Sequence, residues 1–430
     1  MTPQLILIVI IGIVILGFAF EQILDYLNFT KFSAIQPEEA ENIYDNEKYL
    51  NQYNYQRTNY KFGLFEGTFG FILSISMLLF YGFAFVDSLA RELVIDERLV
   101  ILVFFGLLFF SFDIISLPFN IYDTFIIEAK FGFNKTTVTT FILDKLKEWL
   151  LSVVIGVPVI LAVFWFYRQT GSMFWIYTFL LFVGIMVFFL LFYSNLIVPL
   201  FNKQKPLEEG ELKSAINEFA KKVSFSLKDI YVIDGSKRSS KANAYFTGLG
   251  RKKRIVLYDT LIKDLSVNEI VAVLSHEIGH NKKKHVISGT ILSIIQTGLM
   301  LYILSFFLDN PLLSQALGVS KPSFQISIIA FGILYSPVSM ILGIANTIIS
   351  RKNEYAADKY AADYGQAEHL ISALKKLTVN NLSNLTPHPV YVFFNYSHPT
   401  VLQRIKALKQ NSNYHPLLNK SENNNNHQCK

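Results

Sequence analysis

The chain has 430 residues, of which 52% are hydrophobic, 15% are aromatic and only 17% are charged. Soluble domains carry roughly 25% charged residues, so this composition excludes a purely soluble protein and indicates that much of the chain faces lipid. Basic loops beside a membrane explain the net charge of +6 better than a nucleic-acid partner does, and the single cysteine, Cys429, excludes a disulfide framework and a cysteine-ligated metal.

Apolar segments long enough to cross a bilayer occur about seven times. A run of about 20 apolar residues matches the hydrocarbon thickness when it is helical. The first run is too long and too poor in N-terminal basic residues for a cleaved signal peptide, so we expect a retained anchor. Glu66 and Asp113 are costly in lipid, so we expect them to face a polar chamber that the helices enclose. The predicted spans are residues 5–20, 62–85, 99–117, 150–167, 174–200, 286–308 and 325–349.

Lysine and arginine gather in one set of the connecting segments, which indicates the orientation of the chain. The loops that flank membrane helices on the cytoplasmic side are rich in these residues. We therefore expect the N-terminus outside and the C-terminus inside, with the larger polar regions on the cytoplasmic side. The basic segments are residues 21–61, 130–147, 203–284 and the part that follows residue 351.

A metal-binding pattern lies in VLSHEIGHNKKKH, residues 273–285. His276 and His280 are four residues apart and share one face of a helix, where two imidazoles can hold one ion. In metallopeptidases the glutamate of this pattern, here Glu277, takes a proton from the attacking water and passes it to the leaving amine. A chance match in a polar helix is the alternative. Ser266 and Glu269 form the pattern of a capping box, so the motif is predicted to lie inside a helix.

A third ligand is expected from the segment SRKNEYAADKYAADYG after the seventh span. Two membrane crossings return the chain to the side of HEIGH, and Glu354 and Asp358 lie about one helical turn apart. We predict that Glu354 completes a site for one zinc ion per chain and that Asp358 orients a ligating imidazole. Taken alone, this spacing is more typical of a solvated helix face.

At this point the chain resembles the type I CaaX prenyl endopeptidases, which are seven-helix membrane zinc metallopeptidases that cleave near isoprenylated C-terminal cysteines. The resemblance implies that His276, His280 and Glu354 bind zinc, that Glu277 is the general base and that Asp358 is a proton donor. It rests on LPFNIYDTFIIEAKFGFNKTT (117–137), IVPLFNKQKPLEEGELK (197–213), SKRSSKANAYFTGLGRKKRIVLYDTL (236–261), LSHEIGHNKKKH, RKNEYAADKYA and NLTPHPVYVFFNYSHPTVLQRI (384–405).

The same resemblance implies further site residues. Asn243 and Ala244 begin an alternating segment that is predicted to be an exposed strand edge, to which an extended substrate can add as a further strand. By resemblance His398 donates to the oxyanion and Arg404 organises the site. The family commonly has His-Ser-Asn-Ala where this chain has Lys-Ala-Asn-Ala at 241–244, so contacts to the substrate are expected to differ here.

Together these features predict a mainly α, polytopic membrane bundle with a cytoplasmic zinc-peptidase region that contains a small sheet. The partners are a polypeptide substrate, prenylated by resemblance, and the lipid bilayer of a bacterial inner membrane or the endoplasmic reticulum. The alternatives are a quality-control metallopeptidase and, in a different class, a non-catalytic metal-handling transporter. The expected regions are 1–200 (spans one to five), 201–285 (first peptidase region), 286–349 (spans six and seven), 350–411 (second peptidase region) and 412–430 (disordered tail).

Overall fold

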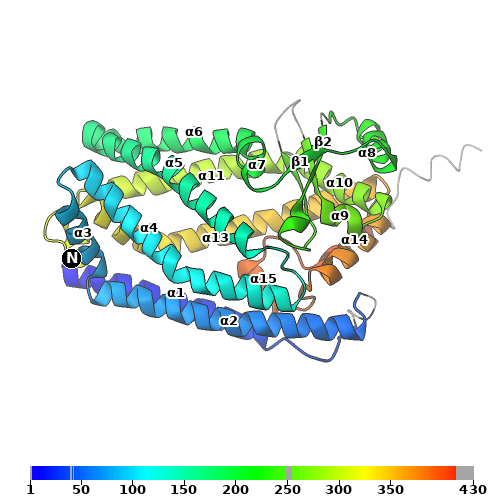
Figure 1. Cartoon of the computed structure of the whole chain (residues 1–430), viewed down its shortest axis with the longest axis horizontal. Helices are drawn as coiled ribbons and strands as arrows, with labels where there is room; N and C mark the ends of the chain where they lie inside the picture. The colour runs from blue at the N-terminus through cyan, green and yellow to red at the C-terminus, as the bar shows by residue number, and fades with distance from the viewer. Residues whose placement is uncertain (1, 39–40, 42, 228, 248–253, 413–430) are drawn as a thin grey trace, which may run out of the picture. The chain divides into compact units, whose positions relative to one another are not determined.

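The computed structural model describes the whole chain except residues 1, 39–40, 42, 228, 248–253 and 413–430. Most of the described residues are helical, and strands between residues 204 and 258 form a small four-stranded sheet (Figure 1). The predicted mainly α class with a small sheet is therefore confirmed. The predicted disordered tail, apart from Ser412, lies outside the described residues.

The chain forms two compact units. The first unit consists of Met1–Phe29, Arg57–Leu190 and Thr290–Gly343, and the second unit consists of Thr30–Gln56, Leu191–Gly289 and Ile344–Lys430. Each unit is thus assembled from three separate segments of the chain.

Seven long helices account for the predicted spans. Among the described residues, six segments are long and apolar enough to cross a membrane, and one of them, Val138–Phe201, holds two long helices that separate at Gly171, where φ is 51°. The second span ends at Leu79 rather than near residue 85, because Tyr81 takes a left-handed φ of 53°. The helices are α1 (Pro3–Phe29), α2 (Asn46–Leu79), α4 (Glu97–Tyr122), α5 (Val138–Thr170), α6 (Phe174–Leu196), α11 (His285–Ser305) and α13 (Phe324–Asp363).

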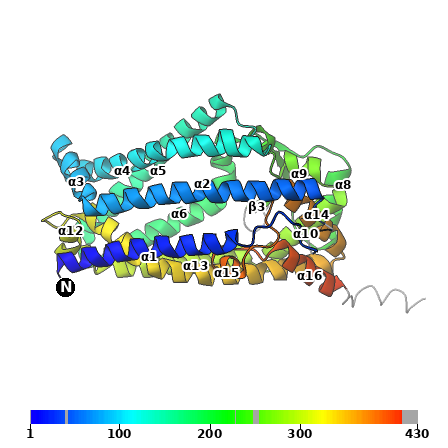
Figure 2. The same cartoon turned by 90° about the horizontal axis from the view of Figure 1, so that it is seen from below.

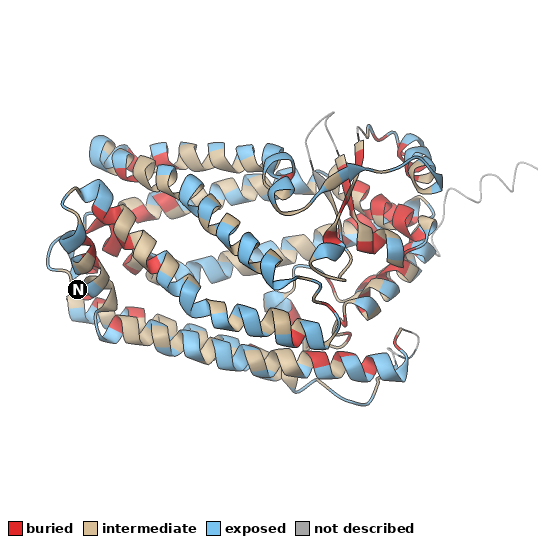
Figure 3. Cartoon of the chain, in the orientation of Figure 1, coloured by how far each residue is buried: buried red, intermediate tan, exposed pale blue. Residues whose placement is uncertain are grey.

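The surfaces of these helices are apolar and exposed. At most 22% of the most apolar window of each span is buried, and Figure 3 shows the long helices mainly in the colours of exposed and intermediate residues. Large side chains such as Leu16 (70% exposed) and Ile341 (63%) would be unfavourable in water but match hydrocarbon. The chain is therefore a multi-pass membrane protein.

Within the first unit, aromatic and aliphatic contacts join α1 to α2. The rings of Phe18 and Phe71 stack with centroids 4.2 Å apart, and the two helices run beside each other in Figure 2. Asp113 in α4 is not left unpaired, because it accepts hydrogen bonds from Trp149 Nε1 (2.8 Å) and Lys145 Nζ (3.3 Å) of α5. Glu66, the other charge within a predicted span, is exposed.

A buried polar cluster links the short helix α3 (Gly82–Leu93) to the start of α13. The Asp87 carboxylate is buried and accepts hydrogen bonds from Arg91 Nε (2.9 Å) and Gln325 Nε2 (2.5 Å). Because the charge is paired and hydrogen-bonded, it can be kept out of water at this end of the first unit.

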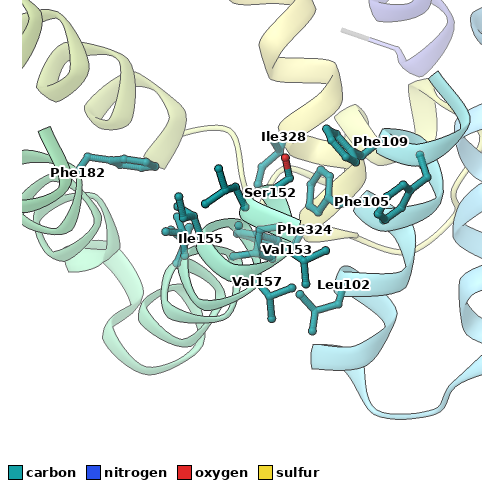
Figure 4. A pocket seen from close by; sticks show the side chains of 17 residues that line it. Leu102, Phe105, Phe109, Ser152, Val153, Ile155, Val157, Phe182, Phe324 and Ile328 are labelled. Carbon is teal, nitrogen blue, oxygen red and sulfur yellow. The ribbon is translucent and has the colours of Figure 1, made fainter. Parts of the chain in front are cut away.

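An apolar groove of about 710 Å³ also lies in the first unit, between α4, α5, α6 and α13. Leu102, Phe105, Phe109, Val153 and Phe182 are among its lining residues, and Ser152 supplies a single hydroxyl (Figure 4). Its lining matches hydrocarbon chains rather than a polar molecule.

The sheet belongs to the second unit and has the strand order β1-β2-β4-β3. The central pair, β2 and β4, is parallel, whereas β1 pairs with β2 and β3 pairs with β4 in the antiparallel sense. Among the described residues β3 is thus an edge strand. The strands are β1 (Gln204–Pro206), β2 (Asp229–Ile233), β3 (Ala244–Thr247) and β4 (Arg254–Tyr258).

Helices cover this sheet and form the main buried core of the second unit. Ile255 and Leu257 of β4 are fully buried with Leu261, Ile270 and Leu274 of the helices that follow. Figure 3 shows that buried residues are concentrated in this region. Complete burial of one large apolar side chain stabilises the fold by about 1.5–3 kcal/mol. The helices of this unit, besides the parts of α2, α6, α11 and α13 that it contains, are α7 (Val198–Phe201), α8 (Glu211–Lys222), α9 (Asp259–Asp264), α10 (Val267–Lys282), α14 (Ala367–Asn380), α15 (Pro389–Asn395) and α16 (Val401–Ser412).

The start of α10 is fixed by the predicted capping box. Ser266 Oγ accepts from the Glu269 backbone N–H, and the Glu269 carboxylate accepts from the Ser266 backbone N–H (2.7 Å). The buried carboxylate also accepts from Ser372 Oγ (2.6 Å) and Lys376 Nζ (2.7 Å) of α14. Burial alone would raise the pKa of Glu269, but the hydrogen bonds from Lys376, Ser372 and Ser266 outweigh it and lower the pKa to about 2.

Replacing Glu269 with glutamine should therefore destabilise the protein by about 1–3 kcal/mol at neutral pH, as measured by thermal unfolding in detergent. Because the folded-state pKa is depressed, the stabilisation is present above the ordinary value of 4.5 and is lost as the pH falls toward about 2. The difference in the free energy of unfolding between the parent protein and the Glu269→Gln variant should therefore decrease between pH 4.5 and pH 2. Lys359→Ala, which breaks only an exposed pair with Asp363, is the control and should change little. A pH-independent difference would contradict this interpretation.

Candidate functional site

Three side chains from two helices of the second unit converge on one point. His276 and His280 project from α10, and Glu354 projects from the C-terminal part of α13. One potential ligand atom of each lies within 4.8 Å of the others. The two imidazole Nε2 atoms are 3.1 Å apart, and Glu354 places Oε2 3.5 Å from His276 Nε2 and Oε1 3.1 Å from His280 Nε2.

These separations suit the binding of one tetrahedrally coordinated ion by all three side chains. Nitrogen and carboxylate ligands bind zinc at about 2.0–2.2 Å, which separates neighbouring ligand atoms by about 3.4 Å. In addition, Glu354 Oε2 is buried and makes no hydrogen bond within the described part of the chain. Within the described residues its cationic neighbours are Arg404 Nη1 (3.3 Å) and His276 Nε2 (3.5 Å), and a buried carboxylate oxygen held only by such long ion-pair contacts fits a cation at this position.

Asp358 and Arg404 lie behind the ligands. Asp358 Oδ1 is 2.8 Å from His276 Nδ1, so an Nδ1–H donates to the carboxylate and leaves Nε2 free for an ion. Arg404 of α16 donates to both oxygens of Asp358 (2.8 and 2.6 Å), and its Nη1 is 3.3 Å from Glu354 Oε2. The structure thus places the guanidinium, only 11% exposed, against the two carboxylates of α13.

The electrostatic environment of His276 depends on these neighbours. Burial favours the neutral imidazole, but the hydrogen bond to Asp358 and the nearby Glu354 carboxylate outweigh it and raise the pKa of His276 to about 9. An ion at Nε2 requires the neutral imidazole with its proton on Nδ1, so metal binding competes with protonation of Nε2.

Glu277, the next residue of α10, is close enough to the same side chains to interact with them electrostatically. Burial raises the pKa of Glu277, and the nearby imidazoles of His276 and His280 oppose this effect. A carboxylate with a raised pKa accepts a proton more readily than an ordinary glutamate, which is the property required of a general base.

His398 lies on the solvent side of the ligands. Its Nε2 is 3.3 Å from Glu354 Oε1, and its side chain is 61% exposed. Ser397 Oγ is 2.9 Å from His398 Nδ1. With the Ser397 hydroxyl donating to Nδ1, the proton of a neutral His398 lies on Nε2, where it can be donated toward the site.

An arginine that the sequence analysis did not single out holds the segment before His398. Arg351 Nη1 donates to the carbonyl oxygens of Val392 (3.3 Å), Phe393 (3.2 Å) and Tyr396 (2.6 Å) at the C-terminal end of α15. A cation is favourable at a helix C-terminus because carbonyl groups there lack partners. The only sequence signal was the position of Arg351 one turn before Glu354.

Asn243 and Ala244 lie at the start of the edge strand β3. Asn243 is exposed, and its Oδ1 accepts from the Ala244 backbone N–H at 2.8 Å. Lys241, at the position where the family commonly has histidine, donates to Tyr55 Oη (3.1 Å) near the start of α2. The contact of Lys241 with Tyr55 thus joins the segment that precedes β3 to α2 within the same unit.

The close approach of α10 and α13 depends on Gly279. A Cβ atom there would lie 3.1 Å from Ala357 Cα and Tyr360 Cβ and 3.2 Å from the Ala357 carbonyl oxygen. Because those distances are shorter than ordinary contacts, a side chain would push the helices apart by a few tenths of an ångström. The glycine between Ile278 and His280 was not recognised as a packing residue in the sequence.

Gly279→Ala should accordingly weaken metal binding by about tenfold, although alanine favours an isolated helix by about 1 kcal/mol. Competition with a chromophoric chelator measures the dissociation constant. Gly289→Ala is the matched control, since a Cβ at Gly289 meets nothing within 4 Å. Equal metal affinity in the parent protein, Gly279→Ala and Gly289→Ala would show that metal binding does not depend on the close approach of α10 and α13.

Comparisons with known proteins agree with this geometry. Residues 25–203 match the family described as CAAX prenyl protease N-terminal, five membrane helices, and residues 206–412 match peptidase family M48. CAAX prenyl protease 1 of Saccharomyces cerevisiae is 36% identical, over 93% of this chain and 94% of that protein. For CAAX prenyl protease 1 homolog of Homo sapiens the identity is 32%, over 87% and 88%.

A solved structure gives the same result. The crystal structure of S. mikatae Ste24p superimposes with a TM-score of 0.90 at 33% identity and covers 94% of this chain and 99% of that chain. The predicted resemblance is thereby confirmed. The matches cover both the membrane helices and the peptidase region, and the chain belongs to the CAAX prenyl proteases of peptidase family M48.

Proposed function

We propose that the chain is a zinc-dependent endopeptidase that cleaves polypeptides near prenylated C-terminal cysteines. Its zinc ligands are His276, His280 and Glu354. The observation that carries the proposal is the convergence of their three ligand atoms at separations suited to one ion. Two histidines and one glutamate with an open fourth position are the ligand set of catalytic zinc in peptidases.

The residues around the ligands have separate tasks in the proposed reaction. A bound zinc ion supplies a Lewis acid that polarises the scissile carbonyl and acidifies water. Glu277 takes the proton from the attacking water and delivers it to the leaving amine. His398 donates Nε2–H to the negative charge that develops on the carbonyl oxygen, and Asp358 with Arg404 holds His276 in orientation.

The proposed substrate is an extended C-terminal peptide that adds to the edge strand β3 beside Asn243 and Ala244. An edge strand offers unpaired backbone groups to such a peptide. The relatives are named CAAX prenyl proteases, which supports a prenylated substrate. The basic segments that flank the spans support a cytoplasmic active site. No nucleic acid has a part in this function.

Two other functions fit a membrane protein with this metal-binding pattern, a metal-handling transporter and a quality-control metallopeptidase. Membership of a peptidase family removes the interpretation as a non-catalytic metal-handling transporter. A quality-control metallopeptidase would use the same residues on unprenylated polypeptides, so only the substrate distinguishes it from the proposed enzyme.

Glu277→Gln should retain zinc and lose about 10²–10⁴-fold in kcat, because the amide keeps the shape of the side chain but cannot accept the proton. Zinc content is measured by mass spectrometry and cleavage by release of a labelled peptide. Glu368→Gln, on an exposed surface of α14, is the control and should keep both properties. Undiminished cleavage by Glu277→Gln would rule out the assigned base.

Prenylation is tested with farnesylated and unprenylated versions of one peptide, with and without a chelator. Chelation should abolish cleavage of both. The farnesylated peptide should have a kcat/KM at least about tenfold higher, since each buried methylene adds about 0.8 kcal/mol. Equal rates for the two peptides would favour the quality-control enzyme, and cleavage that resists complete zinc removal would contradict the metal mechanism.

A further inference from the structure

His285 lies at a sharp change of direction in the chain. The helix α10 ends at Lys282, Lys284 adopts a left-handed φ of 60°, and α11 begins at His285. A non-glycine residue in this conformation is uncommon and is stabilised only when its surroundings require it.

The break changes where the His285 ring can lie. If α10 continued without interruption, a residue five positions after His280 would point about 140° away from it around the helix. Instead the two rings meet edge to face, with centroids 5.0 Å apart and planes at 77°. The turn at Lys284 therefore brings His285 back against the metal-binding side of α10.

The contact involves the nitrogen of His280 that faces away from the ion site. His280 Nδ1 is 3.0 Å from His285 Nδ1, whereas His280 Nε2 is 3.1 Å from Glu354 Oε1. A neutral imidazole carries one N–H and one lone pair. For Nε2 to bind an ion, the proton must lie on Nδ1, and His285 Nδ1 is placed to accept it.

The arrangement parallels that of His276. The ligating Nε2 of His276 is matched by an Nδ1 that lies 2.8 Å from Asp358. Ligating histidines usually donate their second N–H to such a partner, which fixes the tautomer and the ring orientation. Each of the two imidazoles thus has its own partner on the side away from the site.

We propose that His285 is a positioning residue for the metal site, because it accepts the Nδ1–H of His280 and presents His280 Nε2 to the ion. The inference rests on the proposed zinc site and extends it by one residue. His285 does not touch the substrate or the ion in this role, so its removal acts on metal affinity before it acts on the chemical step.

The test is zinc affinity of the purified full-length protein, measured by competition with a chromophoric chelator. His285→Ala should weaken zinc binding 10–100-fold, while kcat at saturating zinc should fall only a few-fold. His285→Gln supplies a carbonyl acceptor and should recover part of the affinity. His369→Ala, an exposed histidine of α14, is the control and should bind zinc like the parent protein.

A lost fold is distinguished from a lost hydrogen bond by the thermal unfolding of the zinc-free proteins, which should be the same for the parent and both His285 variants. Unchanged zinc affinity in His285→Ala would overturn this inference while leaving the zinc site itself intact. Failure of the proposed site has a different signature, in which the parent protein binds no zinc or His276→Ala binds it as tightly as the parent.

Discussion

The approach of the Glu354 carboxylate to the two imidazoles of α10 is the interaction on which the site depends. Its partners come from segments far apart in the sequence, since the chain passes through α11 and the first part of α13 between them. Gly279 allows the contact because it has no side chain at the point where α10 meets Ala357. Asp358, Arg404 and His398 then surround the three ligands, so that a shift of either helix would disturb all of them.

The buried carboxylates of this cluster favour the binding of a cation. Glu354 and Asp358 are buried, and Arg404 offers one positive charge to both carboxylates. Buried charges are tolerated only when they are paired and hydrogen-bonded, and within the described residues Glu354 Oε2 has only long ion-pair contacts, with Arg404 Nη1 (3.3 Å) and His276 Nε2 (3.5 Å). A divalent ion held by the three ligands places further positive charge beside these carboxylates, which couples metal binding to the stability of the second unit.

The sequence predicts the parts of the structure that local patterns determine. Hydropathy places the spans, Ser266 and Glu269 begin α10, and the spacing of His276 and His280 fixes a shared helix face. What it does not reveal arises from contacts distant in sequence or from single backbone angles. Tyr81 ends the second span early, Lys284 turns His285 toward His280, and Arg351 holds the end of α15. None of these residues belongs to a periodic pattern, so only the folded chain shows what they do.

Coordination of one ion by His276, His280 and Glu354 is tested most directly by X-ray absorption at the zinc edge of the purified full-length chain. The predicted spectrum contains two imidazoles and oxygen ligands at about 2.0–2.2 Å. His280→Ala should remove one imidazole from it, and Glu354→Ala should lower zinc occupancy. A spectrum that is unchanged by both substitutions, or that shows sulfur at about 2.3 Å, would contradict the assignment of the ligands.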